Sequence, residues 1–170
     1  SVIKAWATDI NDNDIFICNH PYQGAMHLPD INVVAPVFFE GEIVAWAGTA
    51  AHHIDVGGVN PGSEGPDLKE LFAEGLVIPP TRLYIKGEEN RDLIATVTAN
   101  IRDPLSTVSD LRAQRAACNL GMQRVLELIE SYGNPVVQQV FQNSLASVEK
   151  AVRYRLSQLS NGSGDAIGYL

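Results

Sequence analysis

The hydrophobic pattern of this 170-residue chain changes its period near residue 90, and this change constrains the fold more than any other feature. Before it, short apolar runs rich in Val, Ile and Phe alternate with turns rich in Gly and Pro, which is typical of strands and loops. After it, apolar residues recur every three or four positions, which predicts long helices. We therefore expect an α+β fold with a β-rich N-terminal half and a helical C-terminal half.

Three strands are predicted in the N-terminal half, over residues 14–18, 31–39 and 42–53. Glu40 and Gly41 fit a tight turn that makes a hairpin of the last two strands. Pro36 predicts a bulge or an edge position in the middle strand.

A glycine-rich loop over residues 55–66 follows the hairpin, and residues 67–74 are predicted as a short helix that ends at Gly75. The loop lacks the Gly-Lys-Ser or Gly-Lys-Thr sequence of a nucleotide-binding P-loop. We expect it to form a flexible wall of a functional site rather than a nucleotide site.

The C-terminal half carries clear helix boundaries. Asn90 is a candidate N-cap for a first helix, and Asp103-Pro104 begins a long second helix. Gly133 ends that helix and Asn134-Pro135 begins another, so the pair predicts a long antiparallel helical hairpin.

These patterns predict a β-rich site segment over residues 1–89, a helical segment over 90–160 and a linker over 161–170. The absence of an initiator Met and the Gly- and Ser-rich end suggest a fragment of a larger subunit, with the linker leading into a missing C-terminal part.

Charge and composition exclude several kinds of partner. The formal net charge of -8 argues against a nucleic-acid partner and against an anionic membrane surface, because both need a cationic face. No apolar run approaches the roughly 20 residues that span a bilayer, and the start does not resemble a signal peptide. Cys18 and Cys118 fit two reduced thiols of a cytoplasmic protein.

All four histidines of the chain lie in one short region; they are His20, His27, His52 and His53. His27 and Asp30 are three residues apart in a predicted turn, and the hairpin should fold the histidine pair back toward them. Adjacent strand residues point to opposite faces, so only one of His52 and His53 can join the cluster. Two histidines and one carboxylate predict a reactive site for Mn, Fe or Zn. The alternative is that these are ordinary hydrogen-bonding loop residues.

One cation of the helical half is also a candidate. Arg112 lies near the start of the long helix, close to Asp110 and Gln114. It belongs either to a solvated helix face or to a site where it binds a substrate carboxylate or a loop carboxylate.

Several motifs carry a family resemblance, and they occur at Asp14–Tyr22, His27–Asp30, Ala51–Gly58, Pro61–Ser63, Glu74–Pro80 and Asp110–Gln114. Together they resemble the hydantoinase B / oxoprolinase family, which includes N-methylhydantoinase B, 5-oxoprolinase and the acetone carboxylase large subunit. The resemblance covers about residues 10–133. At His20 the chain departs from an Asn-Asp-Pro-Tyr motif of many relatives, and this should alter the local charge and the choice of substrate.

The resemblance implies a divalent metal on His27, Asp30 and His52, manganese first, with zinc or iron as alternatives. It implies a partner A-type subunit that binds ATP and activates the substrate, so that the complex is a hetero-oligomer. The metal would act as a Lewis acid. His53, Asp55 and His20 are then candidates for acid–base catalysis, and the substrate-binding candidates are Arg112 and Tyr22.

The predicted function is therefore ATP-dependent, metal-assisted hydrolysis of a cyclic amide, either a hydantoin or a 5-oxoproline-like lactam. One alternative is a ketone carboxylase subunit of the acetone carboxylase type. Another is a non-catalytic module that uses its helical hairpin for protein interactions. We expect this fragment to be inactive on its own.

Overall fold

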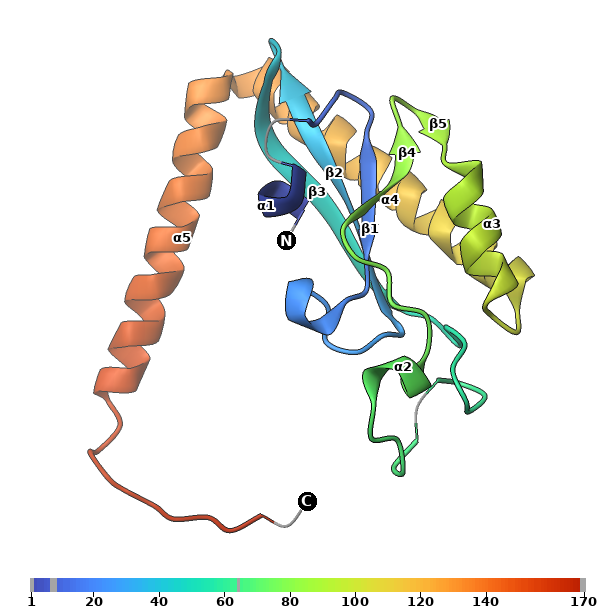
Figure 1. The fold of residues 1–170 in the computed structure, drawn as a ribbon. Coiled ribbons are helices and arrows are strands. Elements are labelled where there is room, and N and C mark those ends of the chain that lie inside the picture. The colour runs from blue at the N-terminus through green and yellow to red at the C-terminus, as the bar shows by residue number, and fades with distance from the viewer. Residues whose placement is uncertain (1, 7–8, 64, 169–170) are drawn as a thin grey trace. The chain divides into compact units, whose positions relative to one another are not determined.

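The computed structural model of the chain describes residues 2–6, 9–63 and 65–168. The elements are α1 (Val2–Trp6), β1 (Ile15–Cys18), η1 (Pro21–Gln23), β2 (Asp30–Phe39), β3 (Glu42–His52), α2 (Leu71–Glu74), β4 (Thr81–Ile85), β5 (Glu88–Glu89), α3 (Arg91–Ala99), α4 (Pro104–Tyr132) and α5 (Asn134–Ser157). The predicted α+β class is confirmed (Figure 1). The helix predicted over residues 67–74 is shorter than expected and begins at Leu71, because residues 68–70 do not have helical structure.

The strands form one five-stranded antiparallel sheet in the order β3-β2-β1-β4-β5. The hairpin turn between β2 and β3 is as predicted, because Glu40 and Gly41 both have positive φ, at 52° and 85°. The bulge expected near Pro36 lies between Val37 and Phe38, where the register of the two strands shifts. β1 pairs with β2 only as far as Val34, so the described ladder on that side needs no N–H from Pro36.

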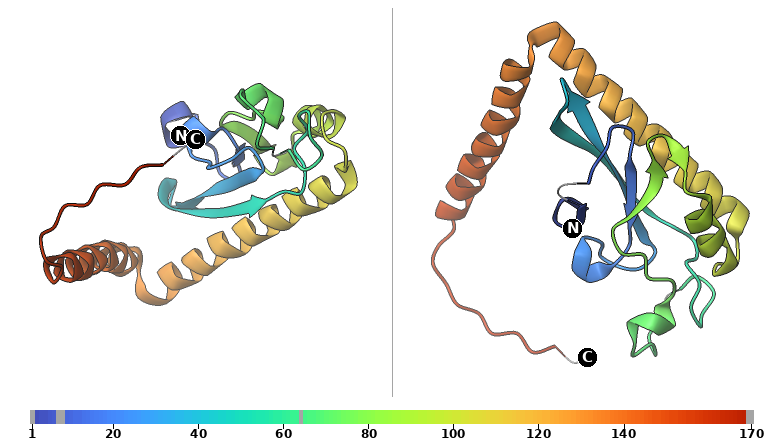
Figure 2. Two further views of the ribbon diagram at one scale, coloured as in Figure 1. Left: turned by 90° about the horizontal axis from the view of Figure 1, so that it is seen from below. Right: turned by 45° about the horizontal axis from the view of Figure 1, so that its top comes forward.

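One face of the sheet forms the main hydrophobic core. Alternate β2 residues, from Ile31 to Val37, are buried on this face. Together with side chains from β1 and β4 they pack against Val97 of α3 and Leu111 and Cys118 of α4. In the view from below in Figure 2, α4 runs along this side of the sheet and α1 lies on the other.

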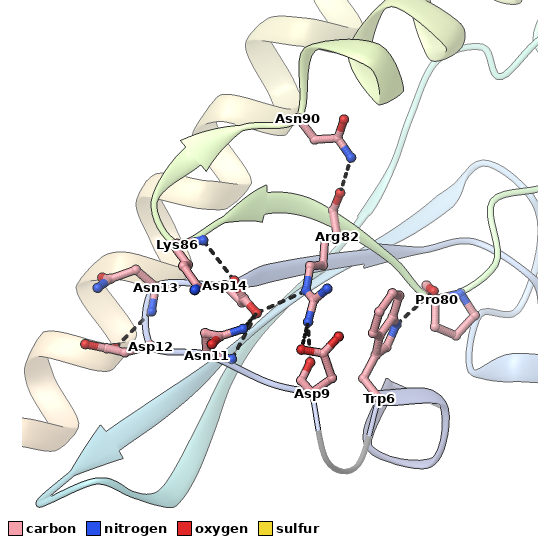
Figure 3. Close-up of polar contacts among 10 residues, drawn as sticks. All are labelled: Trp6, Asp9, Asn11, Asp12, Asn13, Asp14, Pro80, Arg82, Lys86 and Asn90. Atoms are coloured by element: carbon pink, nitrogen blue, oxygen red, sulfur yellow. Dashed lines mark hydrogen bonds and ion pairs between the residues drawn. The ribbon is translucent and has the colours of Figure 1, made fainter.

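The opposite face holds α1 through an aromatic and ionic cluster (Figure 3). The Trp6 ring packs on Phe16 with centroids 5.9 Å apart, and its Nε1 donates to Pro80 O at 3.0 Å. The Arg82 guanidinium lies 4.3 Å above the Trp6 ring and its Nε donates to Asp14 Oδ2 at 3.0 Å. Asp14 is fully buried, and its other hydrogen bonds come from Asn11 and Lys86.

The predicted helix starts are confirmed by their capping contacts. Asn90 Oδ1 accepts from Leu93 N at the start of α3, and Asp103 Oδ1 accepts from Ser106 N at the start of α4. Along α4 the buried positions, which include Leu111, Cys118 and Ile129, follow helical spacing.

Contacts divide the chain into two compact units, one from Ser1 to Glu127 and one from Leu128 to Leu170. Within the second unit, Val137 is buried, and residues on both sides of the junction between its two helical parts line an open apolar pocket of about 240 Å³. Residues 161–168 of the predicted linker have no regular secondary structure, and residues 169–170 lie outside the described residues. The predicted boundary at residue 90 and the antiparallel packing of the two long helices stay predictions. No helix in the described part of the chain is long and apolar enough to cross a membrane.

Candidate metal centre

His27, Asp30 and His52 form a compact cluster at one end of the β2–β3 hairpin. Asp30 lies between the two imidazoles: its Oδ2 is 2.7 Å from His27 Nδ1 and its Oδ1 is 2.8 Å from His52 Nδ1. One ligand atom from each residue lies within 4.8 Å of the others. Both imidazoles are about half exposed, at 52% and 54%, whereas the carboxylate is 21% exposed. The cluster is therefore open to solvent on the imidazole side.

The local chain geometry explains why these residues meet. Asp30 and His52 are directly opposite each other in the β2–β3 register. Their side chains therefore share a face of the sheet. His27 precedes β2 in a turn closed by Asp30 N donating to His27 O, while His27 N donates to Asp30 Oδ2.

The electrostatics keep Asp30 ionised. Burial raises the pKa of this carboxyl group. Hydrogen bonds from the His52 side chain and the His27 main chain, together with the charges of both imidazoles, lower the pKa by more than burial raises it, so the net pKa lies below the ordinary value. Two imidazole nitrogens beside an anionic carboxylate are a donor set typical of reactive Mn, Fe or Zn sites. The residues fit the predicted ion, although metal binding itself stays a prediction.

His53 points to the other face of the sheet, as expected for the neighbour of His52. Its side chain is buried at 1% exposure, and its Nε2 is 2.9 Å from Gln114 Oε1 on α4. Gln114 Nε2 in turn donates to Ile31 O at 2.9 Å. Because the amide nitrogen is engaged as a donor, Gln114 presents an acceptor and His53 Nε2 carries the proton. His53 Nδ1 is buried without a hydrogen-bond partner among the described residues.

Asp55 organises the glycine-rich loop. Its Oδ1 accepts from Gly62 N and from Arg102 Nη1, and its Oδ2 accepts from Gly57 N and from Arg102 N. Burial raises the pKa of Asp55, but these hydrogen bonds, those from Arg102 above all, bring the net pKa below its ordinary value. All four contacts are structural, so the loop is held by Asp55 and Arg102 and is not simply a flexible wall.

The remaining candidates are His20, Tyr22 and Arg112, whose recorded contacts are with residues other than His27, Asp30 and His52. His20 is half-buried and caps η1, where its Nδ1 accepts from Tyr22 N at 3.2 Å. Tyr22 is 89% exposed. Arg112 pairs with Glu89 of β5 at 3.4 Å, at the sheet edge opposite to β3. The structure therefore does not bring Arg112 to the cluster, and its substrate-binding role stays a prediction.

Sequence reasoning missed the residue that fixes the loop carrying His27. Asn19 is fully buried, and its side chain donates to Leu28 O and to Leu76 O and accepts from Ile78 N. A buried Asn directly after an apolar strand signals such a role, because its amide must find partners inside the protein. Two of the partners, Leu76 and Ile78, lie 57 and 59 residues away in sequence, so the pattern could not identify them.

A pocket of about 400 Å³ adjoins the cluster. The loop residues Gly24, Ala25 and Met26 line one side of it. The ends of β2 and β3, with Asp30 and His52, line the other side. A small molecule in this pocket can thus contact the cluster.

Residues 1–170 match the family model described as hydantoinase B/oxoprolinase. The chain is 36% identical to 5-oxoprolinase 1 of Arabidopsis thaliana, over 94% of its own length and 14% of that protein. Its structure is similar to the crystal structure of the ATP-dependent caprolactamase of Pseudomonas jessenii, with a TM-score of 0.89, 32% identity and coverage of 95% and 28% of the two chains. It also resembles nucleotide-free acetone carboxylase, with a TM-score of 0.73, 28% identity and coverage of 78% and 17%. The chain thus spans less than a third of each of these relatives.

Proposed function

Because the chain belongs to the hydantoinase B/oxoprolinase family, we propose that it forms part of the B-type subunit of an ATP-dependent enzyme that hydrolyses a cyclic amide. The observation that carries the proposal is the cluster of His27, Asp30 and His52 beside a pocket. The proposal includes an A-type partner subunit that binds ATP, and a cytoplasmic location.

The cluster residues would hold one divalent ion, with manganese as the first choice and zinc or iron as alternatives. When bound, such an ion supplies Lewis acidity, which polarises a carbonyl oxygen or lowers the pKa of a water molecule. Asp30 supplies the negative charge of the site, and its position between both imidazoles orients them toward a common point. The loop before β2 and the strand ends then position a small substrate beside them.

Among the three acid–base candidates, His20 has the accessibility that contact with a substrate needs, because it is only half-buried. His53 and Asp55 are 1% and 5% exposed, and their side chains are engaged with Gln114 and with the glycine-rich loop. This supports His20 as the proton-transferring group and a positioning role for the other two.

A ketone carboxylase is the second candidate, favoured by the likeness to acetone carboxylase. Both chemistries begin at a carbonyl group, so the same cluster and pocket serve either. Activity assays of the complex with the A-type partner and ATP, with hydantoins and lactams set against ketones and bicarbonate, separate the two candidates. Ring opening supports the hydrolase, and carboxylate formation from ketones overturns it.

We expect about one Mn, Fe or Zn ion per purified chain, lost in the His27→Ala/Asp30→Ala double variant, because a three-ligand site does not survive with one ligand. Elemental analysis measures it.

The matched control is His20→Ala, which removes a histidine outside the cluster and should leave the metal content unchanged. A wild-type chain that neither contains metal nor takes up Mn²⁺ on titration contradicts the metal-assisted mechanism.

A further inference from the structure

The sheet face that carries Asp30 continues past the cluster as a row of residues that are mostly small or apolar. Asp30, Asn32 and Val34 lie on one face of β2, spaced at about 7 Å intervals because alternate strand residues share a face. The β3 residues opposite them are His52, Ala50 and Gly48. The small side chains of Ala50 and Gly48 therefore leave space for a ligand along this face beyond the cluster.

A second pocket, of about 300 Å³, lies farther along this row. Its apolar lining includes Val2, Ile3, Cys18, Val34 and Trp46. The two pockets share Gly24 and Asn32 as lining residues, so they are neighbours. Together the two pockets form a continuous site that is polar at the cluster and apolar at Trp46.

The apolar end is part of the folded structure, because α1 is anchored to the sheet. Phe16 lies between Trp6 and Trp46, at centroid distances of 5.9 Å and 6.5 Å. Trp6 is further fixed by Pro80 O and by the Arg82 guanidinium (Figure 3). The same contacts that hold α1 therefore hold Val2 and Ile3 over the pocket.

Charge further restricts the ligand. No lysine or arginine is found among the described residues that line either pocket. Away from the ion proposed for the cluster, a substrate carboxylate would find no cationic side chain in either pocket, and moving it out of water has a desolvation cost. A hydrocarbon group would instead gain from leaving water at the Trp46 end.

We propose that the second pocket binds the hydrocarbon substituent of a neutral cyclic amide whose carbonyl lies at the His27–Asp30–His52 cluster. This inference rests on the proposed function and narrows it. The substrate class is a hydantoin or lactam with an aliphatic or aromatic arm, rather than 5-oxoproline, which carries a carboxylate and no such arm. The ring alone is too short to contact both ends of the row.

Isothermal titration calorimetry of the Mn²⁺-loaded chain tests this with two probes, 5-benzylhydantoin and 5-oxoproline. We expect 5-benzylhydantoin to bind at least about tenfold more tightly, since each tenfold needs only about two buried methylene equivalents. A separate Mn²⁺ titration of the same samples reports the metal site.

Two variants address the pocket directly. Val34→Phe fills the apolar end and should weaken 5-benzylhydantoin binding about tenfold. Trp46→Ala, which cannot block the pocket, should also weaken it severalfold. The matched control is Ile43→Phe, which adds the same ring to an exposed position on the hairpin outside the pocket and should leave binding unchanged within about twofold. Circular dichroism establishes that each variant is folded.

Each outcome is decisive. Saturable binding of 5-benzylhydantoin that Val34→Phe and Trp46→Ala weaken supports the pocket assignment, even if Mn²⁺ does not bind and the proposed function fails. Normal Mn²⁺ binding with equal or tighter binding of 5-oxoproline, or with unchanged binding in both pocket variants, overturns the assignment and leaves the metal centre intact.

Discussion

Asp30 and Asp55 are both aspartates with lowered pKa values, and their neighbours give them opposite roles. The partners of Asp30 are two half-exposed imidazoles, which are themselves metal-ligand groups. The partners of Asp55 are main-chain N–H groups and the Arg102 guanidinium, which leave its oxygens no room for a substrate. At the scale of single residues, hydrogen-bond partners separate a site carboxylate from a loop-organising one.

Replacing Asp55 should therefore destabilise the fold. In Asp55→Asn an amide N–H₂ group replaces one of the two acceptor oxygens and faces the donors of Arg102 and the loop. We expect the free energy of unfolding to fall by about 2–3 kcal/mol, the usual cost of breaking hydrogen bonds to a buried charge. Urea denaturation measures it.

The control is Asp67→Asn, an exposed carboxylate near the end of the same loop, which should change stability by less than about 0.5 kcal/mol. Equal effects of the two substitutions would show that Asp55 is not the organiser of this loop.

At the scale of elements, the sequence predicted β1, the β2–β3 hairpin with its turn, and the N-caps of α3 and α4, because these depend on local chemistry. It could not choose between His52 and His53 from spacing alone. The choice depends on the bulge between Val37 and Phe38, which makes β3 one residue longer than β2, at 11 and 10 residues. A hairpin with the same turn and no bulge would place Ala51 opposite Asp30 and turn His52 to the core face.

Long-range partners were the other part that the sequence could not provide. Gln114 lies 61 residues from His53 and Arg102 lies 47 residues from Asp55. Periodicity indicates which face of a helix is buried, but not which buried polar group that face meets.

Close packing around the glycine-rich loop gives a prediction for that element. Gly57 and Gly41 have similar φ values, +90° and +85°, but a Cβ at Gly57 would lie 2.3 Å from Asn100 O, whereas a Cβ at Gly41 meets nothing within 4 Å. We expect Gly41→Ala to cost about 1–2 kcal/mol for the left-handed backbone alone. Gly57→Ala should cost more than about 3 kcal/mol, because its backbone must also move.

Thermal or urea unfolding of the two glycine variants compares these costs. Similar losses of stability would mean that the loop moves away from Asn100 at little cost, contrary to the packing that the structure shows.

At the scale of the whole molecule, buried carboxylates should determine the pH below which the free energy of unfolding falls. For Asp14 and Asp55, burial raises the pKa, but hydrogen bonds, together with the Arg82 charge at Asp14, lower the net pKa below the ordinary value of 3.8. The unfolded chain thus binds protons first as the pH falls, and the stability from these groups is present above pH 3.8 and lost below it.

We expect the urea midpoint to fall steeply below about pH 4, where the unfolded carboxylates take up protons. Asp14→Asn should be less stable at neutral pH and lose less stability on acidification. A variant whose midpoint falls as steeply as that of the wild type would show that Asp14 does not contribute to this limit.

The neighbouring histidines at the end of β3 also bear on how the chain can tolerate the loss of a residue during evolution. Loss of one residue from β3, with the turn and the bulge kept, would move His53 into the place of His52 opposite Asp30. A gene that loses one codon within this strand would therefore still encode an imidazole on the face of Asp30. The adjacent histidines therefore allow this strand to shorten by one residue without losing the imidazole opposite Asp30.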